Sequence, residues 1–307
     1  MPDNNFFLVQ YGTASRPNQL GLEESDMLLP LQRAAATHDK PLQLDWLLSD
    51  HPDAPRAADL LRALQGNVQM AVDKTTITPQ APVGRQEIWA AGVTYKRSEE
   101  ARELESNNST IYSRVYNATR PELFFKAMGY DALGMGQPVG IRFDARWSVP
   151  EPELVVVMNA HMEVVGFTIG NDMSSRDIEG ENPLYLPQAK VYEASCALGP
   201  RIWLQPGRTT WPEAKIEMEI ERAGKVVFGG ETSTAAIHRP LAELIEYLGR
   251  CKRFPYGAML FTGTGIVPPD DFGLAEGDQV RIRIDPIGEL VNTVRVVGKR
   301  IQETTKA

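Results

Sequence analysis

The chain has 307 residues, of which 42% are hydrophobic and 23% charged, a composition that excludes a disordered or fibrous protein and supplies a large core. The formal net charge of −8 argues against nucleic acid as a partner, although a local cation can still attract a small anion. The two cysteines, Cys196 and Cys251, form no CxxC pair, which argues against a disulfide scaffold or a zinc–thiolate site. With no signal peptide and no apolar run of about 20 residues, we expect a cytoplasmic location and no membrane partner.

The first third of the chain predicts a small mixed unit. Residues 5–10 (NFFLVQ) read as a buried strand, and residues 30–37 and 55–67 read as helices. The polar segment 71–86 carries two prolines, and on that evidence we place a domain boundary near residue 80. The prediction is a small N-terminal domain over 1–80 and a second domain over 81–307.

Beyond the boundary the pattern changes to short strands separated by turn residues. The predicted strands are residues 87–94, 122–127, 153–158, 163–170, 201–205, 215–221, 225–230, 279–285 and 292–299. Residues 215–230 indicate a hairpin with Ala223 and Gly224 at the turn, while helices are expected over 98–105 and 240–250. Strand-rich stretches with occasional helices favour the α+β class.

Two carboxylates lie at the start of one predicted strand. Glu151 and Glu153 are two residues apart, so both point to one face of an extended chain. A turn centred between residues 160 and 161 would place residue 170 opposite Glu151 and Asp172 just past it. Because neighbouring strands lie roughly 4.8 Å apart, the three carboxylates could share one ion.

Three adjacent carboxylates destabilise one another unless they are protonated or neutralised by a cation. All-oxygen ligation suits Mg²⁺ or Mn²⁺ better than zinc. From these residues alone, a solvated acidic strand end beside an unrelated aspartate is an equally open interpretation.

The runs PEPELVVV, GNDMSSRD and QAKVYEASCALGP, with TGTG (262–265) and residues 274–294, resemble the signature of the fumarylacetoacetate hydrolase superfamily. The resemblance covers roughly residues 85–300. It implies a small N-terminal α/β domain followed by a β-rich mixed-sheet roll, and a homo-oligomer (dimer or tetramer). It implies Mg²⁺, for which Mn²⁺ may substitute, bound by Glu151, Glu153 and Asp172, with Lys190 against the substrate.

One departure from the superfamily pattern points to a particular branch. Hydrolytic members resembling this chain carry a water-activating His and Glu three residues apart, where this sequence has Ser98 and Ala101. The stretches GVTYKRSEEAR and RPELFFKA instead resemble the sugar-acid dehydratases. Such enzymes convert 2-keto-3-deoxy-D-pentonates to 2,5-dioxopentanoate and need no hydrolytic dyad.

The resemblance also suggests roles for individual residues. Lys190 is the candidate for removing the C3 proton or stabilising the enolate, and Glu122 for proton transfer at the C4 hydroxyl. Glu122 could equally be a surface glutamate at a strand end. Arg176 and Asp177 are expected to pair beside the metal ligands. The candidate substrate-binding residues are Lys126, Tyr95, Ser98, Gln188 and Thr264.

Two other functions stay open at this point. The first is hydrolysis of a C–C bond in a 2,4-diketo acid, against which Ser98 argues. The second is a metal-dependent keto-acid sensor without catalysis, which would have no need to keep Lys190 beside the metal ligands.

Overall fold

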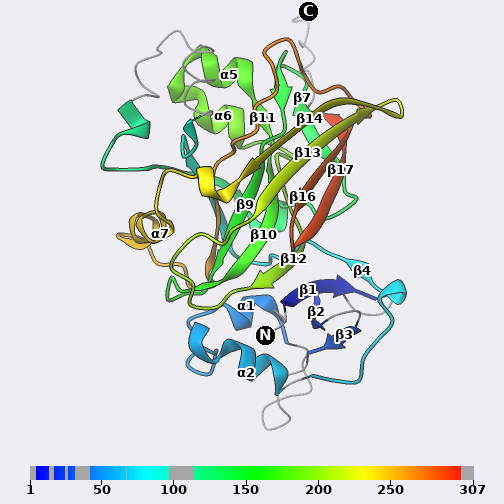
Figure 1. The fold of residues 1–307 in the computed structure, drawn as a ribbon, viewed down its shortest axis with the longest axis vertical. Helices are drawn as coiled ribbons and strands as arrows, with labels where there is room; N and C mark the ends of the chain where they lie inside the picture. Colours follow the sequence, from blue (N-terminus) through cyan, green and yellow to red (C-terminus); the bar gives the residue numbers. More distant parts are fainter. Residues whose placement is uncertain are drawn as a thin grey trace, which may run out of the picture.

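The computed structural model describes residues 5–13, 17–24, 27–31, 42–66, 68–96 and 114–298 (Figure 1). Among these residues, no helix has both the length and the apolar character needed to cross a membrane. The helix predicted over 98–105 lies outside the described residues.

Strands dominate the chain. They are β1 (Phe6–Gly12), β2 (Gln19–Glu24), β3 (Met27–Pro30), β4 (Thr78–Pro79), β5 (Glu87–Gly92), β6 (Glu122–Met128), β7 (Val139–Arg142), β8 (Ser148–Val149), β9 (Pro152–Met158), β10 (Val164–Asp172), β11 (Ser174–Ser175), β12 (Cys196–Leu204), β13 (Lys215–Arg222), β14 (Lys225–Ser233), β15 (Ala258–Phe261), β16 (Gln279–Ile284) and β17 (Gly288–Val297). The α-helices are α1 (Leu44–Leu47), α2 (Leu60–Gln65), α5 (Arg176–Glu181), α6 (Leu186–Lys190) and α7 (Leu241–Gly249). Single 3-10 turns are η1 (Ala57–Asp59), η2 (Lys74–Thr76), η3 (Gly129–Asp131), η4 (Pro183–Tyr185) and η5 (Thr234–Ala236).

Two mixed sheets build the fold and confirm the predicted α+β class. The larger runs in the order β3-β2-β1-β12-β10-β9-β15-β5-β6, and the smaller in the order β14-β13-β16-β17-β7, in front of β9 and β10 in Figure 1. Pairing is antiparallel except between β15 and β5 and between β17 and β7. Because β1 pairs with β12, the N-terminal strands extend the large sheet; the boundary near residue 80 stays a prediction.

The central strand β9 is buried on both faces, which explains its unbroken apolar run. Val156 lies in the core that β10 and the smaller sheet share. Val155 and Val157 lie in a second apolar cluster, which also contains Ile88 of β5 and Leu198 of β12. Glu151 and Glu153 continue the Val155 side of the chain, so the two carboxylates stand at the end of this second cluster.

The N-terminal helix predictions are partly wrong. The segment 55–67 contains η1 and α2, as expected. The helix predicted over 30–37 does not begin there, because Pro30 ends β3 and Leu31 forms an isolated bridge with Val68. Residues 32–37 lie outside the described residues.

The hairpin predicted over 215–230 is confirmed. Ile216 pairs with Thr232 and Arg222 with Lys225. Ala223 and Gly224 both have positive φ, 50° and 76°, as the tight turn that matches the twist of the two strands requires.

The turn between β9 and β10 is tied to the N-terminal unit through Glu163. Its carboxylate pairs with Arg56, accepts the Ala57 N–H at 3.0 Å and accepts from Asn159 Nδ2 at 2.8 Å. These bonds, the Arg56 bond first among them, lower the pKa of Glu163 to about 2.

We expect Glu163→Gln to lower the free energy of unfolding by about 1 kcal/mol at pH 7, because a charge-assisted bond becomes neutral. The pKa is lower in the folded state, so this contribution is present above the unfolded value of about 4.3 and is lost as the pH falls towards 2. Urea denaturation of the wild type and of Glu163→Gln should show that their difference in free energy of unfolding becomes smaller from pH 7 to pH 3. A difference that stayed constant would contradict a stabilising role for the ionised Glu163 carboxylate.

Candidate metal centre

The pairing of β9 with β10 brings three carboxylates to one face of the large sheet. Gly170 pairs with Glu153, and the Asp172 N–H donates to the Glu151 carbonyl at 2.9 Å. Asp172 therefore lies directly opposite Glu151, and the predicted pairing of residue 170 with Glu151 is wrong by two residues. The turn is wider than expected, since Asn159 Oδ1 accepts from the Glu163 N–H, and the register shifts again between Val164 and Gly166.

The three side chains are close together and withdrawn from solvent. One oxygen from each of Glu151, Glu153 and Asp172 lies within 4.8 Å of the others. Their exposed fractions are 2%, 1% and 1%. Two oxygens bound to one ion at roughly 2.1–2.5 Å are at most about 4–5 Å apart, so the arrangement is compact enough to share a cation.

Lys190, at the end of α6, reaches two of these carboxylates. Its Nζ lies 2.7 Å from Glu151 Oε2, 3.1 Å from Asp172 Oδ2 and 2.5 Å from Ser174 Oγ. The lysine side chain is fully buried. Sequence reasoning missed Ser174, although its place two residues after Asp172 was a usable signal.

A second lysine and an arginine hold the same carboxylates from other sides. Lys126 of β6 lies 2.5 Å from Asp172 Oδ1, and its Nζ also donates to the carbonyls of Met173 at 3.0 Å and Lys190 at 2.5 Å. Arg176 Nη2 lies 2.9 Å from Glu151 Oε1. The expected pairing of Arg176 with Asp177 is wrong, since Asp177 Oδ2 accepts the Arg146 N–H.

Glu153 has a different environment from the other two carboxylates. Its Oε2 accepts the Gly263 N–H at 2.5 Å. Burial, followed by the charges of Asp172 and Glu151, raises the pKa of Glu153 well above its usual range, against the opposing effect of Lys190. Gly263 has φ +85°, and a Cβ there would lie 2.1 Å from Thr94 Oγ1, so only glycine brings this N–H to the carboxylate.

The donor set fits a hard divalent cation. Three buried carboxylate oxygens are the ligands that Mg²⁺, Mn²⁺ or Ca²⁺ prefer, and no cysteine or histidine belongs to the group. A cation would relieve the repulsion that raises the pKa of Glu153. Glu151, Glu153 and Asp172 are therefore the side chains that could hold the ion.

Glu122 and Phe124 are alternate residues of β6 and share one face of the strand. The Phe124 ring lies 5.9 Å from Lys190 Nζ. The register between β5 and β6 shifts at Lys126, so simple alternation does not continue to that residue. Glu122 pairs with Gly92 of β5, and a Cβ added to this glycine would lie 2.0 Å from Glu122 Oε2, so the glycine makes room for the carboxylate.

The remaining candidate residues differ in how exposed they are. Tyr95 and Thr264 are buried, with exposed fractions of 1% and 2%, and the Thr264 hydroxyl accepts the Ile266 N–H at 3.2 Å. Gln188 has an exposed side chain on α6, and its carbonyl accepts from Arg142 at 3.2 Å. Ser98 lies outside the described residues.

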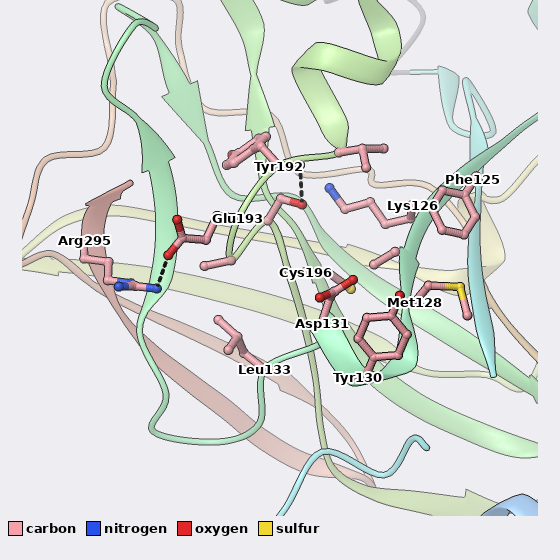
Figure 2. Close-up of a pocket in the computed structure, with 14 residues that line it drawn as sticks. Phe125, Lys126, Met128, Tyr130, Asp131, Leu133, Tyr192, Glu193, Cys196 and Arg295 are labelled. Carbon is pink, nitrogen blue, oxygen red and sulfur yellow. Dashed lines mark hydrogen bonds and ion pairs between the residues drawn. The ribbon is translucent and has the colours of Figure 1, made fainter. Parts of the chain in front are cut away.

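A pocket of about 550 Å³ has Lys126 among its lining residues. Figure 2 shows this pocket with the side chains that line it. Its walls include Tyr192 and Cys196, and the ion pair of Glu193 with Arg295 (2.9 Å) borders it. None of the three clustered carboxylates lines it, so we place the candidate site at the carboxylates.

The strand-rich fold thus buries three carboxylates and two lysines at one end of a sheet, and the carboxylates could hold a divalent cation. The model of the fumarylacetoacetate (FAA) hydrolase C-terminal domain matches residues 87–295. The chain belongs to the fumarylacetoacetate hydrolase family.

Relatives within this family share much of the chain. A probable 2-keto-3-deoxyxylonate dehydratase of Haloferax volcanii is 48% identical over 216 residues, 70% of this chain and 74% of the relative. A 2-dehydro-3-deoxy-D-arabinonate dehydratase of Saccharolobus solfataricus is 42% identical over 219 residues, 70% of this chain and 73% of the relative. A solved 2-keto-3-deoxy-D-arabinonate dehydratase, complexed with magnesium and 2,5-dioxopentanoate, has a TM-score of 0.75 and 31% identity, covering 96% of this chain and 100% of that one.

Proposed function

We propose that this protein is a metal-dependent dehydratase that converts a 2-keto-3-deoxy-D-pentonate, of the D-arabinonate or D-xylonate type, to 2,5-dioxopentanoate. One observation carries the proposal: three buried carboxylates converge within 4.8 Å, and the ammonium of Lys190 touches two of them. That pairing puts a proton-transfer group beside a site for a polarising cation. The names of the similar dehydratases, one of them solved with magnesium and 2,5-dioxopentanoate, support the same reaction.

Glu151, Glu153 and Asp172 would hold Mg²⁺, for which Mn²⁺ would substitute. When bound, the ion supplies Lewis-acid polarisation of the 2-keto acid, which makes the C3 proton more acidic. Lys126 braces Asp172 and the backbone of Met173, so it keeps one ligand in place.

Lys190, as the neutral amine, removes the C3 proton, and Glu122, as the carboxylic acid, donates a proton to the C4 hydroxyl as the C4–O bond breaks. One water leaves. The new C3–C4 double bond then moves to C4–C5 as a proton leaves C5 and one is added at C3. The resulting enol takes a proton at C4 and loses its hydroxyl proton, which gives the aldehyde with no net change in protons. The ring of Phe124, two residues after Glu122 on β6, lies 5.9 Å from Lys190 Nζ and supplies an apolar contact beside the lysine.

Substrate contacts come from Tyr95, Ser98, Gln188 and Thr264, with Lys126 also available for the carboxylate. The domain boundary near residue 80, a homodimer or homotetramer, and a cytoplasmic location complete the proposal and stay predictions from the sequence. The expectation that neither nucleic acid nor a membrane takes part also stays a prediction from the sequence.

Purified protein with Mg²⁺ should convert 2-keto-3-deoxy-D-arabinonate or its D-xylonate equivalent to 2,5-dioxopentanoate, and EDTA should stop the reaction until Mg²⁺ or Mn²⁺ is restored. NMR of the products, with acylpyruvates and 2,4-diketo acids as parallel substrates, is the measurement. Pyruvate release would indicate C–C hydrolysis instead. Tight keto-acid binding with no turnover of any substrate would indicate a sensor.

A further inference from the structure

We propose that the Tyr95 hydroxyl donates a hydrogen bond to the C2 oxygen of the bound 2-keto acid as negative charge develops on it. The inference rests on the proposed function and deepens it, because it gives one side chain the task of stabilising the enolate. Sequence resemblance suggested a contact with substrate but no particular atom.

The Tyr95 ring is held in one position by the segment that also contacts the metal centre. A Cβ on Gly265 would lie 2.6 Å from Tyr95 Cδ1, so the glycine lets the backbone press against the ring. The Tyr95 backbone is fixed by a bridge to Ile237. Gly263, two residues before Gly265, donates its N–H to Glu153. One short segment therefore positions both the tyrosine and a carboxylate.

The hydroxyl of Tyr95 is buried and, among the residues that the structure describes, has no hydrogen-bond partner. A buried hydroxyl left without a partner costs roughly 1–3 kcal/mol, so such a group in a binding site points to an acceptor supplied by the ligand. A phenol at neutral pH can donate its proton to a ligand oxygen, and it donates most strongly to an oxygen that carries or gains negative charge.

The placement of the charged groups selects the ligand atom. The Lys190 ammonium contacts Glu151 and Asp172. If this lysine removes the C3 proton, C3 of the bound keto acid must lie next to it. Burial, and after it the charge of Glu153, raises the pKa of the Tyr95 phenol, so Glu153 is the carboxylate of the group that acts on this hydroxyl. A keto acid held between them turns C3 towards Lys190 and its C2 oxygen towards Tyr95. Donors aimed at a developing oxyanion typically contribute 10²–10³ in rate.

The test compares Tyr95→Phe with Tyr11→Phe, a matched loss of a buried hydroxyl (2% exposed) in β1. For Tyr95→Phe we expect kcat to fall about 100-fold with KM changed less than about threefold. Calorimetry with oxalate, a planar mimic of the enolate, should show at least about tenfold weaker binding in the presence of Mg²⁺. Mg²⁺ affinity should match the wild type, and the melting temperature should be equal or higher because a buried hydroxyl without a partner is removed. Tyr11→Phe should bind oxalate normally.

Unchanged oxalate binding together with unchanged kcat would overturn the proposal. So would a Tyr95→Phe protein that loses Mg²⁺ affinity or thermal stability in parallel with activity, since the hydroxyl would then be a structural brace. If the wild type dehydrates no pentonate but Tyr95→Phe still weakens oxalate binding selectively, the proposed reaction fails while the role of Tyr95 stands.

Discussion

Replacing Glu153 by glutamine is expected to remove Mg²⁺ binding while leaving the metal-free protein at least as stable as the wild type. Burial, and after it the charges of Asp172 and Glu151, raises the pKa of the Glu153 carboxyl. The Gly263 N–H donates a hydrogen bond to this carboxylate. Glutamine keeps an oxygen acceptor for that N–H and removes the repelling charge. The same substitution takes away one of three anionic ligands, so Mg²⁺ affinity should fall at least about 100-fold.

Turnover of the pentonate by Glu153→Gln should fall by about 10³-fold, roughly 4 kcal/mol in barrier, because polarisation of the substrate is lost with the ion. Isothermal titration measures the Mg²⁺ affinity, urea denaturation in EDTA measures the stability of the metal-free protein, and the dehydratase assay measures turnover. Glu193→Gln is the control, since this carboxylate is 62% exposed in its pair with Arg295. A variant that bound Mg²⁺ as tightly as the wild type would end the metal-centre assignment.

The sequence predicted that these three carboxylates come together better than it predicted the strand register that brings them together. Alternation along β9 correctly placed Glu151 and Glu153 on one face, because side-chain direction in a strand is a local property. The partner of Glu151 depended on the exact turn. The Asn159 side chain widens that turn and a shift follows Val164, and neither is visible in the pattern of apolar residues.

The cations around the carboxylates were harder to predict. Lys126, Lys190 and Arg176 come from β6, α6 and α5, elements brought together only by the fold. Sequence proximity suggested that Arg176 pairs with Asp177, whereas the fold turns it to Glu151. Long-range pairing of this kind is decided by packing, and a single sequence carries little local signal for it.

Lys190→Ala should lower kcat by at least about 10³-fold while Mg²⁺ affinity stays within about threefold of the wild type or improves. Proton transfer by a positioned side chain contributes typically 10²–10⁴ in rate, and alanine has no group to replace it. The ammonium competes with a cation for Glu151 and Asp172, so removing it does not weaken the metal site. The two carboxylates keep Arg176 and Lys126 as partners, which limits the loss of stability.

Lys126→Met is the informative comparison for Lys190→Ala. Lys126 contacts Asp172 and two backbone carbonyls, so its loss should lower stability and Mg²⁺ affinity before it lowers the rate of the metal-saturated protein. Steady-state assays at saturating Mg²⁺ measure the rate, and calorimetry measures the Mg²⁺ affinity. Together they distinguish a loss of rate with affinity kept from a loss of affinity that comes before any loss of rate. If Lys190→Ala retained more than about a tenth of wild-type activity, a difference of only roughly 1.4 kcal/mol, another group must remove the C3 proton. Glu122 of β6 would then be the first residue to replace.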